Sequence, residues 1–100
     1  MEIKVNARNG ELTDSVQETI ESKVSKLPRF FDRTTAIQVI VELKHDEPKV
    51  EIILSAEGAS DFFASDTGTN VLTALDTTID KMETQLRKHK EKLTEHRDRH

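Results

Sequence analysis

Two stretches in the middle of the chain alternate apolar and polar residues, and a short polar segment separates them. Every second residue is apolar in residues 36–44 and again in residues 49–56. A period of two residues is typical of a strand that buries one face. Residues 45–48, His-Asp-Glu-Pro, are polar and favour a turn. The sequence therefore predicts an antiparallel hairpin in a sheet that has one buried face.

The first third of the chain predicts a strand followed by a helix. Residues 2–7 alternate like the hairpin strands, and Asn9-Gly10 is a turn sequence. Thr13 can cap a helix, and Pro28, which lacks an amide hydrogen, should end it. The apolar residues at helical spacing between them are Val16, Ile20, Val24 and Leu27.

The rest of the chain predicts a fourth strand and a long helix. Gly58 turns the chain into a short strand around residues 61–65, and residues 66–69 form a loop. Asn70 can cap a helix that runs to at least residue 93. The residues that continue its apolar stripe are Leu72, Leu75, Ile79, Met82, Leu86 and Leu93, with His89 between the last two.

The predicted order is β-α-β-β-β-α, which indicates an α+β fold. A four-stranded mixed sheet with both helices on one face gives a two-layer sandwich around one core. The first two strands should be parallel because a helix connects them. A chain of 100 residues supports a single core. We therefore expect one domain in residues 1–93 and an exposed, frayed tail in residues 94–100.

The charge is unevenly distributed along the chain, whose net charge is −4. Residues 23–33 contain four basic residues and one acidic residue, and residues 81–100 contain seven basic and four acidic residues. The remaining segments are strongly acidic. Local patches rather than the total set the field that a ligand experiences. The net acidity therefore does not exclude a polyanionic partner.

The basic residues of both predicted helices lie in rows. At about 100° per residue, one flank of the long helix carries Lys81, Lys88, Lys92 and Arg99. The opposite flank carries Asp76, Asp80 and Glu83. The first helix has Lys23 and Lys26 on one side of its apolar stripe. A row of cations fits the phosphates of a nucleic acid, and the alternative is an ordinary solvated face.

Patterns for catalysis, metal binding and membrane insertion are weak. Cysteine is absent, so thiolate chemistry is excluded, and no nucleophile has an orienting base. His96 and His100 have metal-ligand spacing, but no acidic ligands accompany them. No apolar run reaches the roughly 18 residues of a membrane span. We expect a soluble cytoplasmic protein that is not an enzyme, with no cofactor, metal or membrane partner.

Two runs of residues resemble a known family. The first is Lys26-Leu27-Pro28-Arg29-Phe30-Phe31-Asp32-Arg33. The second comprises Ala74-Leu75-Asp76, Ile79-Asp80-Lys81 and residues 85–93, Gln-Leu-Arg-Lys-His-Lys-Glu-Lys-Leu. They resemble the helix junction and the second helix of the ribosome hibernation promoting factors and ribosome-associated inhibitors, the sigma-54 modulation protein family. The similarity extends over nearly the whole chain.

The resemblance implies a protein that binds the small ribosomal subunit in the channel for messenger RNA and transfer RNA. Such proteins inhibit translation by occlusion, in stress and stationary phase, and their basic residues contact ribosomal RNA. The matching positions are Lys23, Lys26, Arg29, Arg33, Lys81, Arg87, Lys88, Lys90 and Lys92. Long members add a domain that dimerises ribosomes. This chain resembles a short member, which would use a separate dimerising factor, or the N-terminal domain of a long member.

Two positions depart from the pattern of this family. Thr84 stands where many relatives have arginine, which removes one cation, and Leu72 stands where many have tyrosine, which removes a stacking partner.

A second hypothesis is a non-ribosomal interaction or regulatory module that self-associates through the open face of its sheet. Phe62 and Phe63 should point to opposite faces of a strand, so that one lies in the core. The other would lie beside Ile40 and Ile53 on the uncovered face, where an apolar patch could bind a partner.

Overall fold

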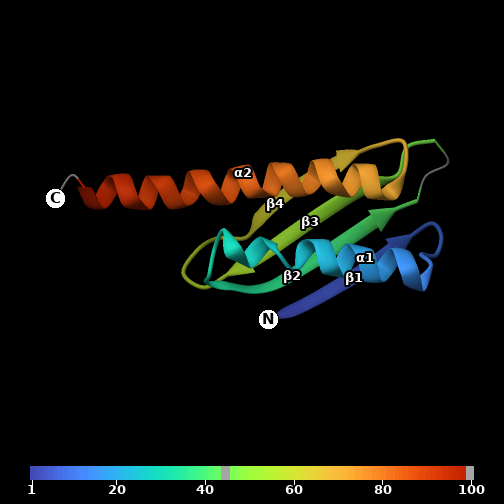
Figure 1. The fold of residues 1–100 in the computed structure, drawn as a ribbon, viewed down its shortest axis with the longest axis horizontal. Coiled ribbons are helices and arrows are strands. Elements are labelled where there is room, and N and C mark those ends of the chain that lie inside the picture. Colours follow the sequence, from blue (N-terminus) through green and yellow to red (C-terminus); the bar gives the residue numbers. More distant parts are fainter. Residues whose placement is uncertain (44–45, 99–100) are drawn as a thin grey trace.

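The computed structural model describes residues 1–43 and 46–98, and the side chains among them up to residue 90. Its elements confirm the predicted order β-α-β-β-β-α, with one added 3₁₀ turn, η1 (Figure 1). They are β1 (Glu2–Arg8), α1 (Asp14–Val24), η1 (Leu27–Arg29), β2 (Thr34–Glu42), β3 (Lys49–Ala56), β4 (Phe62–Thr67) and α2 (Val71–Asp98).

The strands form one mixed sheet in the order β1-β2-β3-β4. β1 pairs with β2 in parallel, as expected for strands joined by a helix, and the other pairs are antiparallel. In the middle of the sheet, Val39 is in register with Val5 on one side and with Ile52 on the other. Figure 1 shows both helices on the same face of this sheet. The predicted two-layer sandwich is therefore confirmed.

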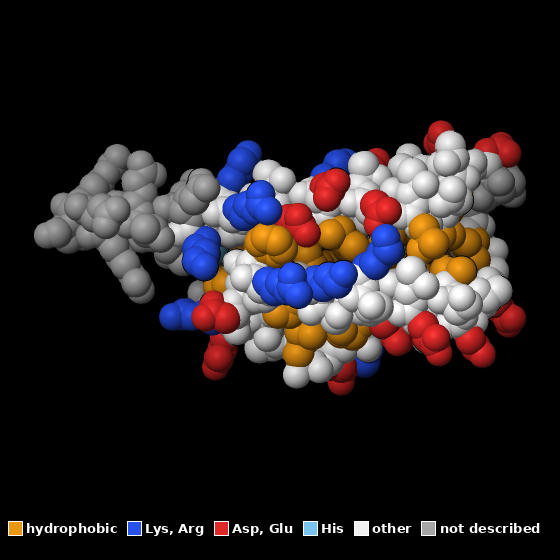
Figure 2. Space-filling model, in the orientation of Figure 1, with side chains coloured by type: hydrophobic (Ala, Val, Ile, Leu, Met, Phe, Trp, Pro, Cys, Tyr) orange, Lys and Arg blue, Asp and Glu red, His pale blue; other side chains and the backbone are white. Residues whose placement is uncertain are grey.

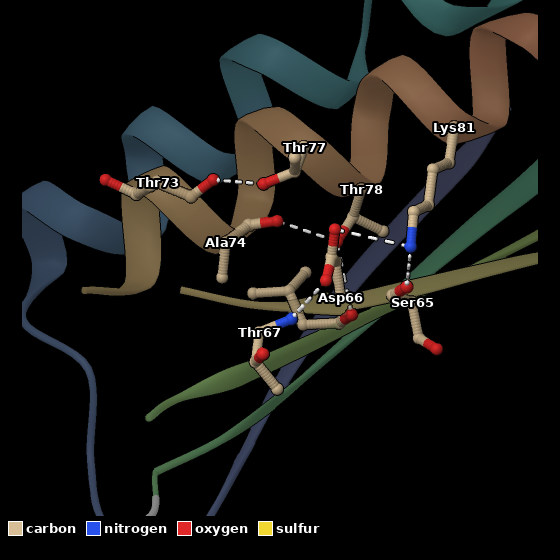
Figure 3. Close-up of polar contacts among 9 residues, drawn as sticks. Ser65, Asp66, Thr67, Thr73, Ala74, Thr77, Thr78 and Lys81 are labelled. Carbon is tan, nitrogen blue, oxygen red and sulfur yellow. Dashed lines mark hydrogen bonds and ion pairs between the residues drawn. The ribbon is translucent and has the colours of Figure 1, made fainter. Parts of the chain in front are cut away.

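The core lies between the helices and this face. Its fully buried side chains come from alternate positions of β2 and β3 and from the apolar stripes of the helices: Ile20, Val24, Leu27, Ile37, Val39, Val41, Val50, Ile52, Leu54, Leu75, Met82 and Leu86. Thr78 is also buried, and its hydroxyl donates a hydrogen bond to the Ala74 carbonyl at 2.7 Å (Figure 3). This bond satisfies the polar group, so that the core tolerates it.

Both predicted helix caps are present. The Val16 amide donates to Thr13 Oγ1 at 3.2 Å, and the Thr73 amide donates to Asn70 Oδ1 at 2.9 Å. Each bond satisfies an amide that has no partner within its own helix. α1 ends before Pro28, and the chain continues as the 3₁₀ turn η1.

β4 differs from its predicted boundaries. It was expected around residues 61–65, but it begins at Phe62 and includes Asp66 and Thr67, which were expected to lie in a loop. These two polar residues continue the register with Val50 and Lys49 of β3. The prediction relied on alternation of apolar and polar residues, and the end of this strand shows none because both of its last residues are polar.

α2 is the longest element and makes the molecule elongated, with dimensions of 52 × 24 × 18 Å. Figure 1 shows it extending beyond the end of the sheet. Its backbone is helical through Asp98, so the helix continues into the segment that we expected to be a frayed tail. The side chains of that segment, and residues 99–100 altogether, lie outside the described residues.

Candidate nucleic-acid interface

One flank of α2 faces α1 and η1. Lys23 Nζ of α1 lies 2.8 Å from Asp76 Oδ1 of α2. Farther along α2, the guanidinium of Arg87 lies 5.0 Å from the centroid of the Phe30 ring, directly after η1. Lys26 and Arg29, at the two ends of η1, lie in the chain between Lys23 and Phe30. We call these four predicted phosphate-binding residues the inter-helix group: Lys23, Lys26, Arg29 and Arg87. Lys90, three residues after Arg87, lies on the same flank by helical spacing.

The opposite flank of α2 faces β4. Lys81 Nζ donates to the Ser65 carbonyl at 3.2 Å and lies 3.3 Å from Asp66 Oδ2 (Figure 3). Lys88 is two turns farther along and shares this flank, because seven residues rotate a helix by only about 20° from a full multiple of turns. The predicted row of Lys81 and Lys88 therefore borders β4 and not α1. The Lys92 side chain of the same row lies outside the described residues.

Arg33 lies near the start of β2, beside the turn that follows β3. A Cβ atom on Gly58 in this turn would lie 3.3 Å from Arg33 Nη1. The Glu57 amide donates to the Arg33 carbonyl at 3.0 Å, which joins the two segments. Arg33 is exposed and close in sequence to η1. Figure 2 shows Lys and Arg side chains gathered over the middle and left of the helix face, whereas acidic side chains line its lower right edge.

Contacts between the two helices explain in part why each helix carries its acidic and basic residues on separate flanks. The acidic flank of α2 begins at Asp76, and this flank faces the basic flank of α1 through the ion pair with Lys23. In Figure 2, acidic side chains along α2 lie opposite basic side chains at the end of α1. Complementary charge between the helices therefore accounts for some of the pattern that suggested a polyanion. Lys23 and Lys81 have carboxylate partners, whereas no described side chain forms an ion pair with Lys26 or Arg29.

Aromatic rings hold η1 against α2. Phe31, Phe62 and His89 form a three-ring cluster with centroid distances of 5.3–5.7 Å, and two of its contacts are edge-to-face. The cluster joins the segment after η1 to β4 and α2, beside the stack of Arg87 on Phe30. Packing of this kind fixes the spacing between the cations of η1 and those of α2. This role of the rings was not predicted from the sequence, although the position of His89 within an apolar stripe was a signal for it.

Phe62 and Phe63 point to opposite faces of β4, as predicted. Phe62 packs against the core, whereas the Phe63 side chain is 58% exposed on the open face of the sheet. It lies in register with Ile53 of β3.

The two departures from the family pattern have clear structural positions. Thr84 is exposed on α2, and its hydroxyl donates to the Asp80 carbonyl of the preceding turn at 2.9 Å. It therefore leaves a neutral gap on the surface of α2. Leu72 is partly buried and packs against the core, so this position is used for folding.

The Asp66 carboxyl at the end of β4 has a lowered pKa. The hydrogen bond from the Thr67 amide lowers the pKa of the Asp66 carboxyl from its ordinary value of 3.8, and the Lys81 side chain lowers it further. Both contacts favour the ionised form. Asp66 and Lys81 together tie the end of β4 to α2 (Figure 3).

Asp66→Asn should lower stability at neutral pH and have less effect in acid. Because the pKa of Asp66 is lower in the folded state, its ionised form stabilises the fold above about pH 4, and this contribution is lost as the pH falls through the folded-state pKa. Urea denaturation at pH 7 and at pH 2.5 measures the difference between variant and wild type. Asp61→Asn is the control, because Asp61 is exposed and lies before β4. A difference that is the same at both pH values would contradict this assignment.

No helix among the described residues is long and apolar enough to span a membrane. The described side chains also contain no group of three or more His, Asp or Glu residues that could hold a metal ion.

Comparison with known proteins identifies relatives over nearly the whole chain. Residues 3–94 match the family model described as sigma 54 modulation protein / S30EA ribosomal protein. The chain belongs to this family. A ribosome hibernation promoting factor of Azotobacter vinelandii is 35% identical over 95% of this chain and 88% of its own length. A ribosome hibernation promoting factor of Escherichia coli K12 is 31% identical over 96% of this chain and all of its own length.

Solved structures agree with this membership. The N-terminal domain of Thermus thermophilus Protein Y superposes with a TM-score of 0.78 at 26% identity, over 89% of this chain and 99% of that chain. A ribosomal subunit interface protein of Coxiella burnetii gives a TM-score of 0.83, over 91% and 99% of the two chains. At 22% identity this second similarity concerns the fold alone. The predicted family and fold are confirmed, and so is the prediction of a non-enzymatic protein, because this family comprises hibernation factors.

Proposed function

We propose that this protein is a ribosome hibernation factor that binds the small ribosomal subunit and occludes the channel for messenger RNA and transfer RNA. The observation that carries the proposal is the membership in the sigma 54 modulation protein / S30EA family, with relatives named for ribosome hibernation that match nearly the whole chain. The charge distribution supports ribosomal RNA as the surface that it contacts. Its site of action is then the cytoplasm, where ribosomes translate.

The inter-helix group is the part of the surface best suited to phosphates. Lys26 and Arg29 are exposed and have no ion-pair partner among the described side chains, so they can approach phosphates without breaking an internal contact. Lys23 must exchange Asp76 for a phosphate. This exchange costs little, because exposed ion pairs contribute only about 0–1 kcal/mol. Arg87 presents a guanidinium that its stack on Phe30 holds in place.

The other predicted contacts surround this group. Lys81 and Lys88 border β4, Arg33 lies beside the turn after β3, and Lys90 and Lys92 lie farther along α2. We assign residues 1–93 to a single ribosome-binding domain. A separate ribosome-dimerising factor is a further proposed partner.

The wild-type protein should co-sediment with small subunits, and the affinity should fall as salt rises. Each phosphate contact releases counterions and contributes about −0.7 to −0.9 to the slope of log K against log salt concentration. Four to six contacts therefore predict a slope of about −3 to −5. Sedimentation of purified subunits with the protein, between 50 and 300 mM salt, measures this slope. A protein that stays at the top of the gradient at the lowest salt while the subunits pellet would refute the proposal.

Self-association through the open face of the sheet is the alternative function. Phe63 and Ile53 are neighbours on this face, but Gln38 is the other neighbour of Ile53, and Ile40 is in register with Glu51. Polar side chains thus interrupt the apolar surface, and this makes the face a weaker docking site than a continuous patch. A dimer that survives high salt, in a protein that does not bind ribosomes, would favour this alternative.

A further inference from the structure

The two edges of the sheet differ in how they are covered. Side chains of α2 occupy the free edge of β4: Gln85 Nε2 donates to the Phe63 carbonyl, and Lys81 Nζ donates to the Ser65 carbonyl at 3.2 Å. β1 is the strand at the opposite edge and pairs only with β2 among the described strands. Unpaired backbone groups on an edge strand can pair with another chain. The free edge of β1 is therefore the available site for adding a strand.

The register of β1 shows which of its backbone groups are free. The Leu43 amide donates to the Arg8 carbonyl at 2.9 Å, so Arg8 directs its backbone groups towards β2. Backbone groups alternate between the two sides of a strand. Ile3, Val5 and Ala7 therefore direct their amide and carbonyl groups to the open edge. These three residues lie symmetrically about Val5.

We propose that two copies of this chain associate by pairing their β1 strands antiparallel, with a two-fold axis at Val5. Val5 then pairs with Val5 of the other copy, and Ile3 pairs with Ala7, with backbone hydrogen bonds at each of these pairs. Glu2 lies opposite Arg8 of the other copy at both ends of the interface. The strand is thus complementary to itself in backbone register and in charge. The two sheets become one continuous sheet, with all helices on the same face.

The side chains of β1 can make these contacts at small cost. Ile3, Val5 and Ala7 are only half-buried at the margin of the core, so a second copy would cover them further. The Arg8 side chain is exposed and has no ion pair among the described residues. Glu2 pairs with Lys4 at 3.5 Å, and both side chains of this pair are about two-thirds exposed. Such an exposed pair exchanges readily for Arg8 of the other copy.

The acidic flank of α1 opposes this association. Lys23 places one flank of α1 against α2, so Asp14 and Glu21, on the other flank, face the side of the molecule where β1 has its free edge. In the dimer these carboxylates approach those of the second copy. Salt screens charges that are separated by more than the Debye length of about 8 Å at 0.15 M, and it screens contacting charges less. Added salt should therefore weaken the repulsion between the α1 carboxylates more than the attraction between Glu2 and Arg8. For this reason the experiment should be made at about 0.3 M salt.

The test uses charge exchange between the two ends of β1 and sedimentation equilibrium of the full chain up to millimolar concentration. Wild type should show a monomer–dimer equilibrium. Glu2→Arg places arginine opposite Arg8, and Arg8→Glu places glutamate opposite Glu2. The dimer of each variant alone therefore has two like-charge pairs and should form about tenfold more weakly than the wild-type dimer. An equimolar mixture of the two variants restores both opposite pairs and should dimerise like wild type. A structural role of either residue would not produce this rescue.

Two further variants separate the outcomes. Val5→Pro removes an amide on the free edge and none that faces β2, so it should abolish the dimer while the folded monomer persists, as judged by circular dichroism. Phe63→Ser should leave the dimer unchanged. A wild type that remains monomeric at millimolar concentration, or a dimer that is lost with Phe63→Ser and not with the β1 variants, would overturn the proposal. This inference is independent of ribosome binding, so Lys26→Glu with Arg29→Glu should leave the dimer intact.

Discussion

Reversing two charges of the inter-helix group, Lys26→Glu with Arg29→Glu, should weaken binding to the small subunit by about a hundredfold at 100 mM salt. Each reversal removes a phosphate contact and adds a repulsion, so roughly a factor of ten per position is expected. The slope of log K against log salt should become shallower by about 1–2. Sedimentation with small subunits gives both quantities, and inhibition of cell-free translation should fall in parallel. Both side chains are exposed, so the thermal unfolding temperature should change little.

Lys49→Glu, paired with Lys4→Glu, is the matched control for this variant. It changes the net charge by the same amount, but both lysines belong to strands and lie outside the basic surface of the helices. We expect its affinity to stay within about threefold of wild type, since exposed charges beyond the Debye length act weakly. If both double variants lost affinity equally, binding would depend on net charge alone. The assignment of the inter-helix group would then be wrong.

Periodicity in the sequence was sufficient to predict most of the fold. The alternation in residues 36–44 and 49–56 corresponds to β2 and β3, and the caps at Thr13 and Asn70 are where they were expected. These signals are local and each has one physical cause, either a buried face or an unsatisfied amide. The end of β4 was predicted wrongly because Asp66 and Thr67 are held by pairing with β3 and by Lys81. Such tertiary contacts leave no period in the sequence.

The candidate site was predictable in composition but not in arrangement. A helical projection gives the angle between Lys81 and Asp76, but it does not say which of these two flanks faces the other helix. The structure answers this question through the contact of Lys23 with Asp76 and that of Lys81 with β4. The row of Lys23 and Lys26 and the row of Lys81 and Lys88, which were expected to act together, therefore lie on different sides of α2. The segregation of charge serves helix packing as well as the proposed binding of phosphates.

Leu27→Ala should cause a large loss of stability, because this residue anchors the turn that carries the inter-helix group. Leu27 is 1% exposed and is the buried residue of η1, between Lys26 and Arg29. Truncation of a buried leucine lowers the free energy of unfolding by about 2–5 kcal/mol, out of about 5–15 kcal/mol for a typical domain. At about 4–8 °C per kcal/mol for a chain of this size, the unfolding temperature should fall by at least about 8 °C. Thermal unfolding followed by circular dichroism measures this change.

The comparison of Leu27→Ala with Leu27→Met separates anchoring from simple hydrophobicity. Methionine nearly conserves the volume of leucine, so Leu27→Met should cost less than about 1.5 kcal/mol. At 10 °C, where the folded form of each variant predominates, Leu27→Ala should also bind small subunits more weakly than Leu27→Met. The reason is that η1 is packed through this side chain, and a loosened turn no longer fixes the spacing between Arg29 and Arg87 before binding. Equal affinities of the two variants would mean that the cations bind without a preformed arrangement, and the turn would then matter for folding alone.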